Sequence, residues 1–151
     1  MVFDRNSDGI INDGSELFGQ NTPLLNGGFA DNGFAALAQE DTNGDGIIDF
    51  NDLNWSNLKI WQDKNQDGIS QSNELFTLDE LGITSINIDY QINNTSLSNG
   101  NYLYGTGSYT TTDGLTHDLA DVVLAQDTFN SRFTEQVLIP IEDKDILWVF
   151  P

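Results

Sequence analysis

A six-residue pattern, Asp-x-Asn-x-Asp-Gly, occurs three times in the first half of the chain, beginning at Asp4, Asp41 and Asp63. Asp and Asn favour turns, and Gly at the sixth position permits a sharp turn of the backbone. The spacing puts side-chain oxygens at positions 1, 3 and 5, as in the loop with which an EF-hand surrounds calcium. Three copies in so short a stretch do not arise readily by chance, so the pattern predicts three calcium-binding loops joined by short elements.

The three loops differ at the position that closes the coordination shell. In an EF-hand loop, the backbone carbonyl at position 7 and an acid at position 12 complete the ligands. Position 12 is Asp52 in the second loop and Glu74 in the third, but it is Ser15 in the first. The first loop must therefore close through Asp13 or Glu16, and both remain candidates. The predicted ligands of two to three calcium ions are Asp4, Asn6, Asp8, Ile10, Asp13 and Glu16 in the first loop, Asp41, Asn43, Asp45, Ile47, Asp49 and Asp52 in the second, and Asp63, Asn65, Asp67, Ile69 and Glu74 in the third.

Two residues within the loops qualify the comparison with EF-hands. Asp52 is one methylene shorter than the usual Glu, which makes closure by two oxygens harder and magnesium easier to accept. Ser70 stands at position 8 of the third loop, where paired EF-hands carry an aliphatic residue that bridges the loops, so conventional pairing is not expected. The alternative to a metal site is a turn-rich surface without an ion, and the threefold recurrence favours calcium.

The charge of the chain narrows the range of partners. The formal net charge is −19, which argues against nucleic acid and anionic membrane surfaces. No apolar run is long enough for a membrane span. Because many of the acidic residues lie in the three loops, their repulsion should leave the metal-free chain loose and the calcium-bound chain compact. The chain has no cysteine, so bound calcium would stabilise the fold in the way that disulfides do in other secreted proteins.

The segments around the loops are short. Residues 29–40 carry apolar side chains at helical spacing and predict the clearest helix, capped by Asp31 or Asn32. Only residues 53–62 separate the second loop from the third. Two helices do not fit there, so one short helix of about 15 Å is expected, with room for an extended end near 58–61.

The second half of the chain has the periodicity of strands. Apolar and polar residues alternate over 86–92, as in a half-buried strand. Residues 102–112 and 115–124 flank a turn at Asp113-Gly114. This arrangement predicts a β-hairpin.

Taken together, these patterns predict an α+β fold. Residues 1–76 would form EF-hand-like calcium loops with short helices, and residues 77–126 a small antiparallel β-sheet. His117, the one histidine, is most simply a hairpin side chain, and no Cys/His cluster, phosphate-binding loop or nucleophile elbow is present, so no catalytic residue is assigned. The aromatic side chains expected in the core are Phe18, Phe34, Trp55 and Trp61.

The start of the chain suggests that it is part of something longer, whereas its end leaves this question open. Only residues 1–3 precede the first loop, so we expect its entering element to be truncated. Residues 146–151 are apolar up to the last residue, where a free terminus is usually polar. This ending fits either a strand or a sorting signal, and both stay open.

Several motifs follow one another in the order found in a known module. They are Phe3-Asp4, Asn12–Gly19, Ala35–Ala38, Trp61–Gln71, Leu78–Ile83 and Ser131–Phe133. Over roughly residues 2–133 the chain resembles the calcium-dependent self-processing module of FrpC-like RTX proteins, which Gram-negative bacteria secrete. The resemblance implies such a module over residues 1–133, with residues 134–151 as an unassigned C-terminal extension. It also implies a longer parent protein and an extracellular location reached by type I secretion.

In the family that the chain resembles, calcium folds the module, which then cleaves an Asp-Pro bond at its own N-terminal edge. The Asp carboxylate attacks its own carbonyl to give a cyclic anhydride, and a lysine amine of a partner protein can open the anhydride to form an isopeptide link. Attack within one residue needs no encounter between separate molecules. This chain departs from the pattern because none of its prolines follows aspartate. They are Pro23, Pro140 and Pro151, preceded by Thr22, Ile139 and Phe150.

Two functions follow as hypotheses, and the missing Asp-Pro bond leaves open whether the chain is an enzyme. The first is a calcium-binding module of a secreted RTX-type protein that folds on meeting extracellular calcium, with an affinity on the order of 10⁻⁵–10⁻³ M. Such a module would take part in self-processing. The second is a purely structural, calcium-stabilised spacer or adhesin domain with no chemistry.

Overall fold

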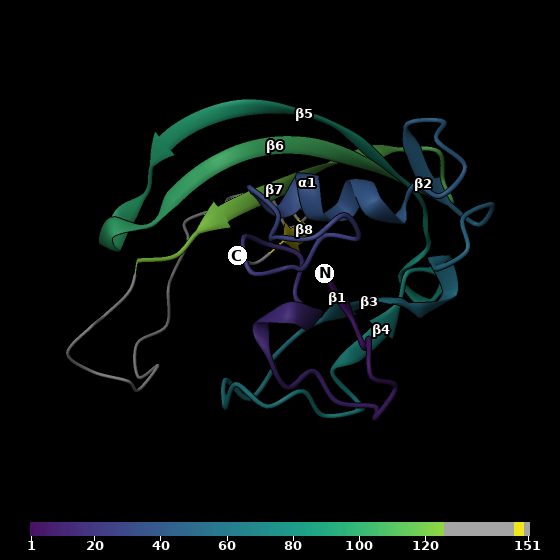
Figure 1. Cartoon of the computed structure of the whole chain (residues 1–151), viewed down its shortest axis with the longest axis horizontal. Coiled ribbons are helices and arrows are strands. Elements are labelled where there is room, and N and C mark those ends of the chain that lie inside the picture. Colours follow the sequence, from purple (N-terminus) through teal and green to yellow (C-terminus); the bar gives the residue numbers. More distant parts are fainter. Residues whose placement is uncertain (126–146, 150–151) are drawn as a thin grey trace.

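The computed structural model of the protein describes residues 1–125 and 147–149, which form a mostly β fold (Figure 1). A three-stranded sheet has the order β1-β3-β4, and a five-stranded sheet has the order β2-β5-β6-β7-β8. Neighbouring strands are antiparallel, except that β8 is parallel to β7. The strands are β1 (Val2–Phe3), β2 (Ile47–Asp49), β3 (Leu58–Trp61), β4 (Leu75–Thr77), β5 (Ile83–Ser96), β6 (Tyr102–Thr111), β7 (Thr116–Val123) and β8 (Leu147–Val149). The helical elements of the described residues are α1 (Gly33–Leu37) and the 3₁₀ turns η1 (Gly14–Glu16), η2 (Ala38–Glu40), η3 (Trp55–Asn57), η4 (Asp79–Leu81) and η5 (Ser98–Gly100).

The predicted α+β fold with EF-hand loops is wrong, because strands and single 3₁₀ turns flank the loops where helices were expected. Between the second and third loops the chain forms η3 and then β3, so the extended end takes the place of the helix. The third loop leads into β4 and not into an exiting helix. Leu58 and Ile60 alternate with half-buried residues and are themselves buried, as the period of two in a strand requires.

The helix predicted over residues 29–40 is present but much shorter. Phe29 forms an isolated β-bridge with Pro23, which keeps the backbone extended at the expected start. α1 begins after Asn32, whose side chain accepts a hydrogen bond from Ala35 N at 2.9 Å. This confirms one of the two predicted caps. After five residues the helix tightens into η2.

The antiparallel strands predicted in the second half are confirmed. β5 contains the alternating segment 86–92, and β6 and β7 form the hairpin around Asp113-Gly114. The β5–β6 ladder is interrupted between Asn87 and Gln91, where three residues of β5 face Gly107 alone. Such extra residues bend a strand, and β5 curves over α1 together with β6 (Figure 1).

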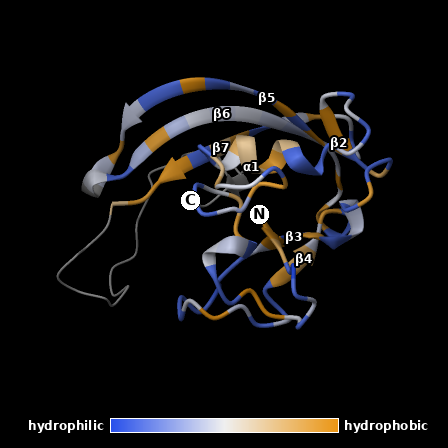
Figure 2. Ribbon diagram, viewed as in Figure 1, coloured by the Kyte–Doolittle hydropathy of each residue, from blue (hydrophilic) through white to orange (hydrophobic). Residues whose placement is uncertain are grey.

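The core lies between α1 and the curved five-stranded sheet and continues to β1 and β3, where Figure 2 shows apolar segments. Phe34 of α1 is 1% exposed and stacks on Tyr90, with ring centroids 4.6 Å apart. A Cβ added to Gly107 would stand 2.6 Å from Phe34 Cε1, so the sheet leaves room for the ring only where it carries glycine. Of the aromatic residues expected in the core, Phe18, Phe34 and Trp55 are buried and Trp61 is half-buried.

The last part of the chain is described only at β8. Residues 147–149 form this strand beside β7, which is one of the two alternatives for the apolar ending. The motif at 131–133 and the rest of the predicted extension 134–151 lie outside the described residues. Where the structure describes the chain, none of its helices has the length and hydropathy needed to cross a membrane.

Candidate cation-binding loops

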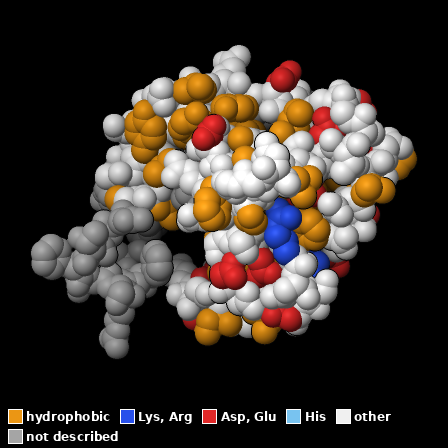
Figure 3. All heavy atoms as spheres, in the orientation of Figure 1, with side chains coloured by type: hydrophobic (Ala, Val, Ile, Leu, Met, Phe, Trp, Pro, Cys, Tyr) orange, Lys and Arg blue, Asp and Glu red, His pale blue; other side chains and the backbone are white. Residues whose placement is uncertain are grey.

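The three repeats form three loops with one pattern of burial. We call them loop one (residues 4–16), loop two (41–52) and loop three (63–74). In each, position 1 is half-buried, positions 3 and 5 are exposed, and position 8 is buried, as is the last acidic residue. Loops one and three lie at the same end of the molecule, and loop two lies beside β2 (Figure 1). Acidic side chains gather at the end that loops one and three form (Figure 3).

The side chains at positions 1, 3 and 5 shape each loop from within. In loop one, Asp4 accepts hydrogen bonds from Asp8 N at 3.2 Å and Gly9 N at 2.8 Å. Asn6 Oδ1 accepts from Asp8 N at 2.9 Å, and Asp8 Oδ1 accepts from Ile10 N at 2.9 Å. The equivalent residues of loops two and three make the same four bonds. The repeat in the sequence is therefore a repeat in structure.

The backbone of the loops repeats as well. Positions 4 and 6 have positive φ in all three loops, between 60° and 89°, at Ser7, Gly9, Gly44, Gly46, Gln66 and Gly68. No atom lies within 4 Å of a Cβ added at position 6. Glycine is therefore needed there for its left-handed conformation and not for space.

Loop two is closed by Asp52, which is 5% exposed. Its carboxylate accepts hydrogen bonds from Thr42 N at 2.7 Å, on one oxygen, and from Asp49 N at 2.9 Å, on the other. Burial by itself would raise the pKa of Asp52, but the backbone N–H groups of Asp49, Thr42 and Asn43 and the Thr42 hydroxyl together lower it. The carboxylate thus remains charged inside the protein.

Loop one places Glu16, not Asp13, in the equivalent position. Glu16 is 2% exposed and accepts hydrogen bonds from Arg5 N at 3.2 Å and Asn12 N at 2.9 Å, which are positions 2 and 9 of the loop. Those are the positions that bond the closing acid of loop two. Asp13 instead caps η1, and its hydrogen bonds from the Ser15 hydroxyl and N–H lower its pKa.

Loop three leaves one carboxylate oxygen without a partner. Glu74 is 2% exposed, and its Oε1 accepts a hydrogen bond from Lys64 N at 3.0 Å. Glu74 Oε2 is buried and has no hydrogen-bond partner. A buried polar oxygen in this state is costly unless a cation or a donor reaches it. In the residues that the structure describes, no three His, Cys, Asp or Glu side chains are grouped closely enough to hold a metal ion.

The loops differ in what they pack against. Positions 7–9 of loop two form β2, which pairs with β5 so that Ile48 faces Ile86. Position 8 of loop three meets position 8 of loop one, where the hydroxyl of Ser70 accepts a hydrogen bond from Ile11 N at 2.6 Å. The serine expected to prevent a conventional pair thus joins loops one and three through its side chain.

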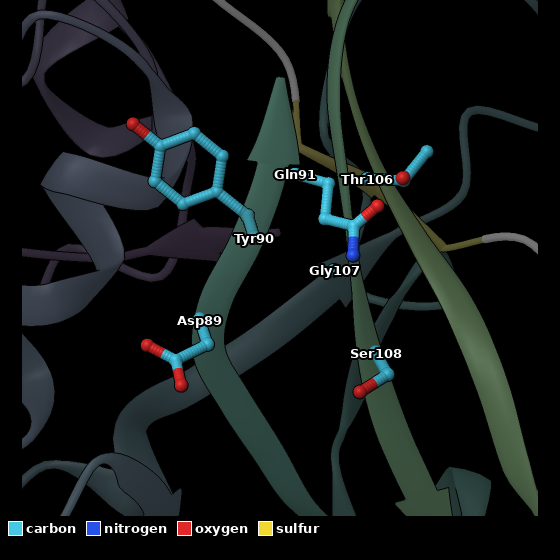
Figure 4. Close-up of a pocket in the computed structure, with 6 residues that line it drawn as sticks. All are labelled: Asp89, Tyr90, Gln91, Thr106, Gly107 and Ser108. Carbon is cyan, nitrogen blue, oxygen red and sulfur yellow. The ribbon is translucent and has the colours of Figure 1, made fainter. Parts of the chain in front are cut away.

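Two further features lie outside the loops, an open hollow in the larger sheet and the side chain of His117. An open hollow of about 440 Å³ lies at the break in the β5–β6 ladder, lined by Asp89, Tyr90, Gln91, Thr106, Gly107 and Ser108 (Figure 4). Asp89 is the one acidic side chain among these six lining residues and none of them is basic, so they offer no acid–base pair. His117 stacks on Tyr109 at 5.1 Å, and its Nε2 lies 3.1 Å from Thr111 Oγ1, which fits the structural role expected for it.

The SPM domain family matches residues 1–125. The chain belongs to this family. Together with the relative described next, this match confirms the predicted resemblance to the modules of FrpC-like proteins. A relative of this SPM domain is the iron-regulated protein FrpA of Neisseria meningitidis serogroup C, a Gram-negative bacterium, with 52% identity over 142 residues. The match covers 94% of this chain but only 13% of the length of FrpA.

The SPM structure also gives roles to residues that the motifs did not single out. Arg5 forms an ion pair with the buried Glu40 at 3.5 Å. Asp121 of β7 is 2% exposed and accepts a hydrogen bond from Gly33 N at 2.8 Å, at the start of α1. These residues are distant in sequence from what they contact. The scarcity of basic residues, five in all, is the one signal in the sequence that could have drawn attention to Arg5.

Asp121 is expected to make the stability of the SPM domain depend on pH. Burial raises the pKa of Asp121, although the hydrogen bond from Gly33 N opposes this. A carboxyl whose pKa is higher in the folded than in the unfolded state stabilises the fold below the unfolded value, and this contribution is lost as pH rises through the folded value. The free energy of unfolding of Asp121→Asn, relative to that of wild type, should therefore increase as the pH rises from about 4 to about 7.

Urea unfolding at both pH values measures this difference. Asp118→Asn is the matched control, because Asp118 lies on the same strand and is exposed. A stability difference between Asp121→Asn and wild type that stays constant with pH would contradict the prediction.

Proposed function

We propose that this SPM domain binds two to three calcium ions through loops one, two and three, and that the ions complete its fold. The observation that carries the proposal is Glu74 Oε2, a buried carboxylate oxygen at the closing position of loop three with no hydrogen-bond partner. An ion in the loop would supply the missing positive charge. The same oxygen-rich sequence pattern and backbone recur in three loops, which supports a shared role for them.

The donor set fits a hard cation. Calcium takes six to eight oxygen ligands and no nitrogen or sulfur is required. Loop two offers the side chains of Asp41, Asn43, Asp45, Asp49 and Asp52 and the carbonyl of Ile47. Glu16 would close loop one, and Glu74 would close loop three. These are not EF-hands, since strands and 3₁₀ turns flank them, but the ligand spacing within each loop does not depend on helices.

The ions would link folding to the calcium concentration. Without them, the carboxyl groups of Glu16, Asp52 and Glu74 are buried with no cation in their loops, and Glu74 Oε2 has no hydrogen-bond partner. With them, the domain becomes compact. A domain that folds on reaching millimolar extracellular calcium suits a secreted protein, and an affinity on the order of 10⁻⁵–10⁻³ M would place the change in that range.

Calcium binding is tested by titrating calcium into EGTA-treated protein. Calorimetry measures the heat of binding, and circular dichroism measures the change in structure. We expect heat for two to three ions and a gain of ordered structure. Glu74→Gln keeps the size of the side chain but removes its charge, and should weaken one site by about 100-fold, because ligand charge sets calcium affinity. Glu80→Gln is the matched control, since Glu80 is exposed and bonds Thr77 outside the loops. Absence of both heat and structural change in wild type would refute the calcium assignment.

The second part of the proposal is that the domain serves self-processing in a longer, secreted RTX-type parent. Family membership supports it, and the bond to be cut would be an Asp-Pro bond outside this chain. In that reaction the Asp carboxylate attacks its own carbonyl carbon, the C–N bond breaks, and the proline nitrogen leaves as a protonated amine. The resulting anhydride would be opened by water or by the lysine amine of a partner protein.

A longer version of the chain that includes an upstream Asp-Pro bond distinguishes this from the alternative of a purely structural spacer or adhesin domain. It would be incubated with millimolar calcium or EGTA and run on a denaturing gel. Two fragments formed only with calcium are expected for self-processing. A single uncut band in both lanes would leave the spacer as the function.

A further inference from the structure

The hydroxyl of Ser70 holds a peptide group of loop one that carries a proposed ligand. Ile11 N donates to Ser70 Oγ at 2.6 Å, and Ser70 Oγ donates to Ile11 O at 3.3 Å. Both residues are buried, at 4% and 6% exposure. The N–H of Ile11 and the carbonyl of Ile10 belong to one planar peptide group, so fixing the first fixes the direction of the second. That carbonyl is position 7 of loop one. Ser70, a residue of loop three, therefore sets the orientation of a ligand of loop one.

A second tie runs from loop one to the entrance of loop two. Arg5 donates its backbone N–H to Glu16 Oε1 at 3.2 Å, and its guanidinium Nη2 lies 3.5 Å from Glu40 Oε1. Glu40 immediately precedes Asp41, the first ligand of loop two, and its side chain is 4% exposed. Its other oxygen accepts a hydrogen bond from Asn54 Nδ2 at 2.8 Å. One residue, Arg5, thus bonds the closing acid of loop one and anchors the residue from which loop two begins.

We propose that Ser70 and the Arg5–Glu40 pair are positioning residues that couple the three loops, with loop one as the link between the other two. The proposal rests on the proposed calcium binding. Occupation of loop three would hold Ser70 in place and so orient the Ile10 carbonyl for an ion in loop one. Occupation of loop one would hold Arg5 and, through Glu40, the start of loop two. Couplings of this kind change affinity by about 5-fold to 150-fold.

Each loop has its own reporter for such a coupling. The amide N–H groups of Gly9, Gly46 and Gly68 donate to the position 1 carboxylate of their loop at 2.8, 2.9 and 2.9 Å. An ion bound by that carboxylate polarises the N–H, so the amide resonance of each glycine reports occupation of its own loop. Calcium titration of EGTA-treated, ¹⁵N-labelled protein gives one midpoint for each loop.

Removing the Ser70 hydroxyl should change the ratio between the calcium midpoints of loops one and three. In Ser70→Ala, we expect the ratio of the Gly9 midpoint to the Gly68 midpoint to rise at least about 5-fold above its wild-type value. A role of Ser70 in overall stability alone would move all three midpoints together. Ser72→Ala, an exposed serine two positions further along loop three, should leave the midpoints unchanged.

Glu40→Gln tests the Arg5–Glu40 contact between loops one and two. This test does not depend on whether Ser70→Ala folds. It keeps the size of the side chain but removes the charge that faces Arg5, so the midpoint of Gly46 should rise relative to that of Gly9. Glu80→Gln serves as its control. Midpoints that keep their wild-type ratios in both variants would overturn the coupling. A wild-type protein whose glycine amides do not respond to calcium would instead refute the calcium proposal itself.

Discussion

Chelation of calcium is expected to remove most of the stability of this SPM domain. An ion that binds only the folded state stabilises it by about 2.7 kcal/mol at 100 times its Kd, so three such ions would contribute about 8 kcal/mol. That is comparable to the total stability of a small domain, roughly 5–15 kcal/mol. Loop three also connects β3, the central strand of the smaller sheet, to its neighbour β4, so collapse of this loop would disrupt the pairing of the two strands.

Thermal unfolding followed by circular dichroism, in excess calcium and in EGTA, measures this effect. We expect a cooperative transition with calcium and a very weak or absent one with EGTA. Magnesium at the same concentration controls for ionic strength. It should raise the transition temperature less than calcium does, because Mg²⁺ requires stricter geometry and keeps its waters. Equal transition temperatures in calcium and EGTA would contradict the proposed role of the ions.

Truncation of Phe34 is expected to be the most damaging single change in the core. Phe34 is 1% exposed, stacks on Tyr90, and fills the space above Gly107. Phe34→Ala should lower the free energy of unfolding by about 3–5 kcal/mol, through lost burial and the cavity left behind. Urea unfolding in saturating calcium measures the loss. Phe29→Ala is the matched control, because Phe29 is 67% exposed and its truncation should change stability by less than about 0.5 kcal/mol.

A double-mutant cycle with Gly107→Ala tests the geometry of this contact. Alone, Gly107→Ala should cost about 1–3 kcal/mol, because the new Cβ would stand 2.6 Å from Phe34 Cε1. Once Phe34 is alanine, the same change meets no ring and should cost much less. Since Gly107 does not have positive φ, the backbone itself accepts alanine. Costs that simply add in the double variant would show that Phe34 and Gly107 do not compete for the same space.

The prediction of helices failed where tertiary pairing competed with local periodicity. Residues 29–40 have helical spacing, but the bridge between Phe29 and Pro23 keeps the start extended, and only the part after Asn32 winds. The segment before the third loop is too short to bury the face of a helix. As a strand it instead forms backbone hydrogen bonds with both β1 and β4. The strands of the second half were predictable because a period of two, bounded by turn residues, is a local property.

The sequence by itself determined the three loops, because the conformation of each depends on residues within a few positions: side chains at positions 1, 3 and 5 and the left-handed glycine at 6. It also determined the family, through motifs in a particular order. Only the tertiary structure decided that Glu16 closes loop one and that Ser70 and the Arg5–Glu40 pair join the loops. Those contacts link residues as far as 59 positions apart, and no local pattern specifies which distant backbone groups a buried side chain will meet.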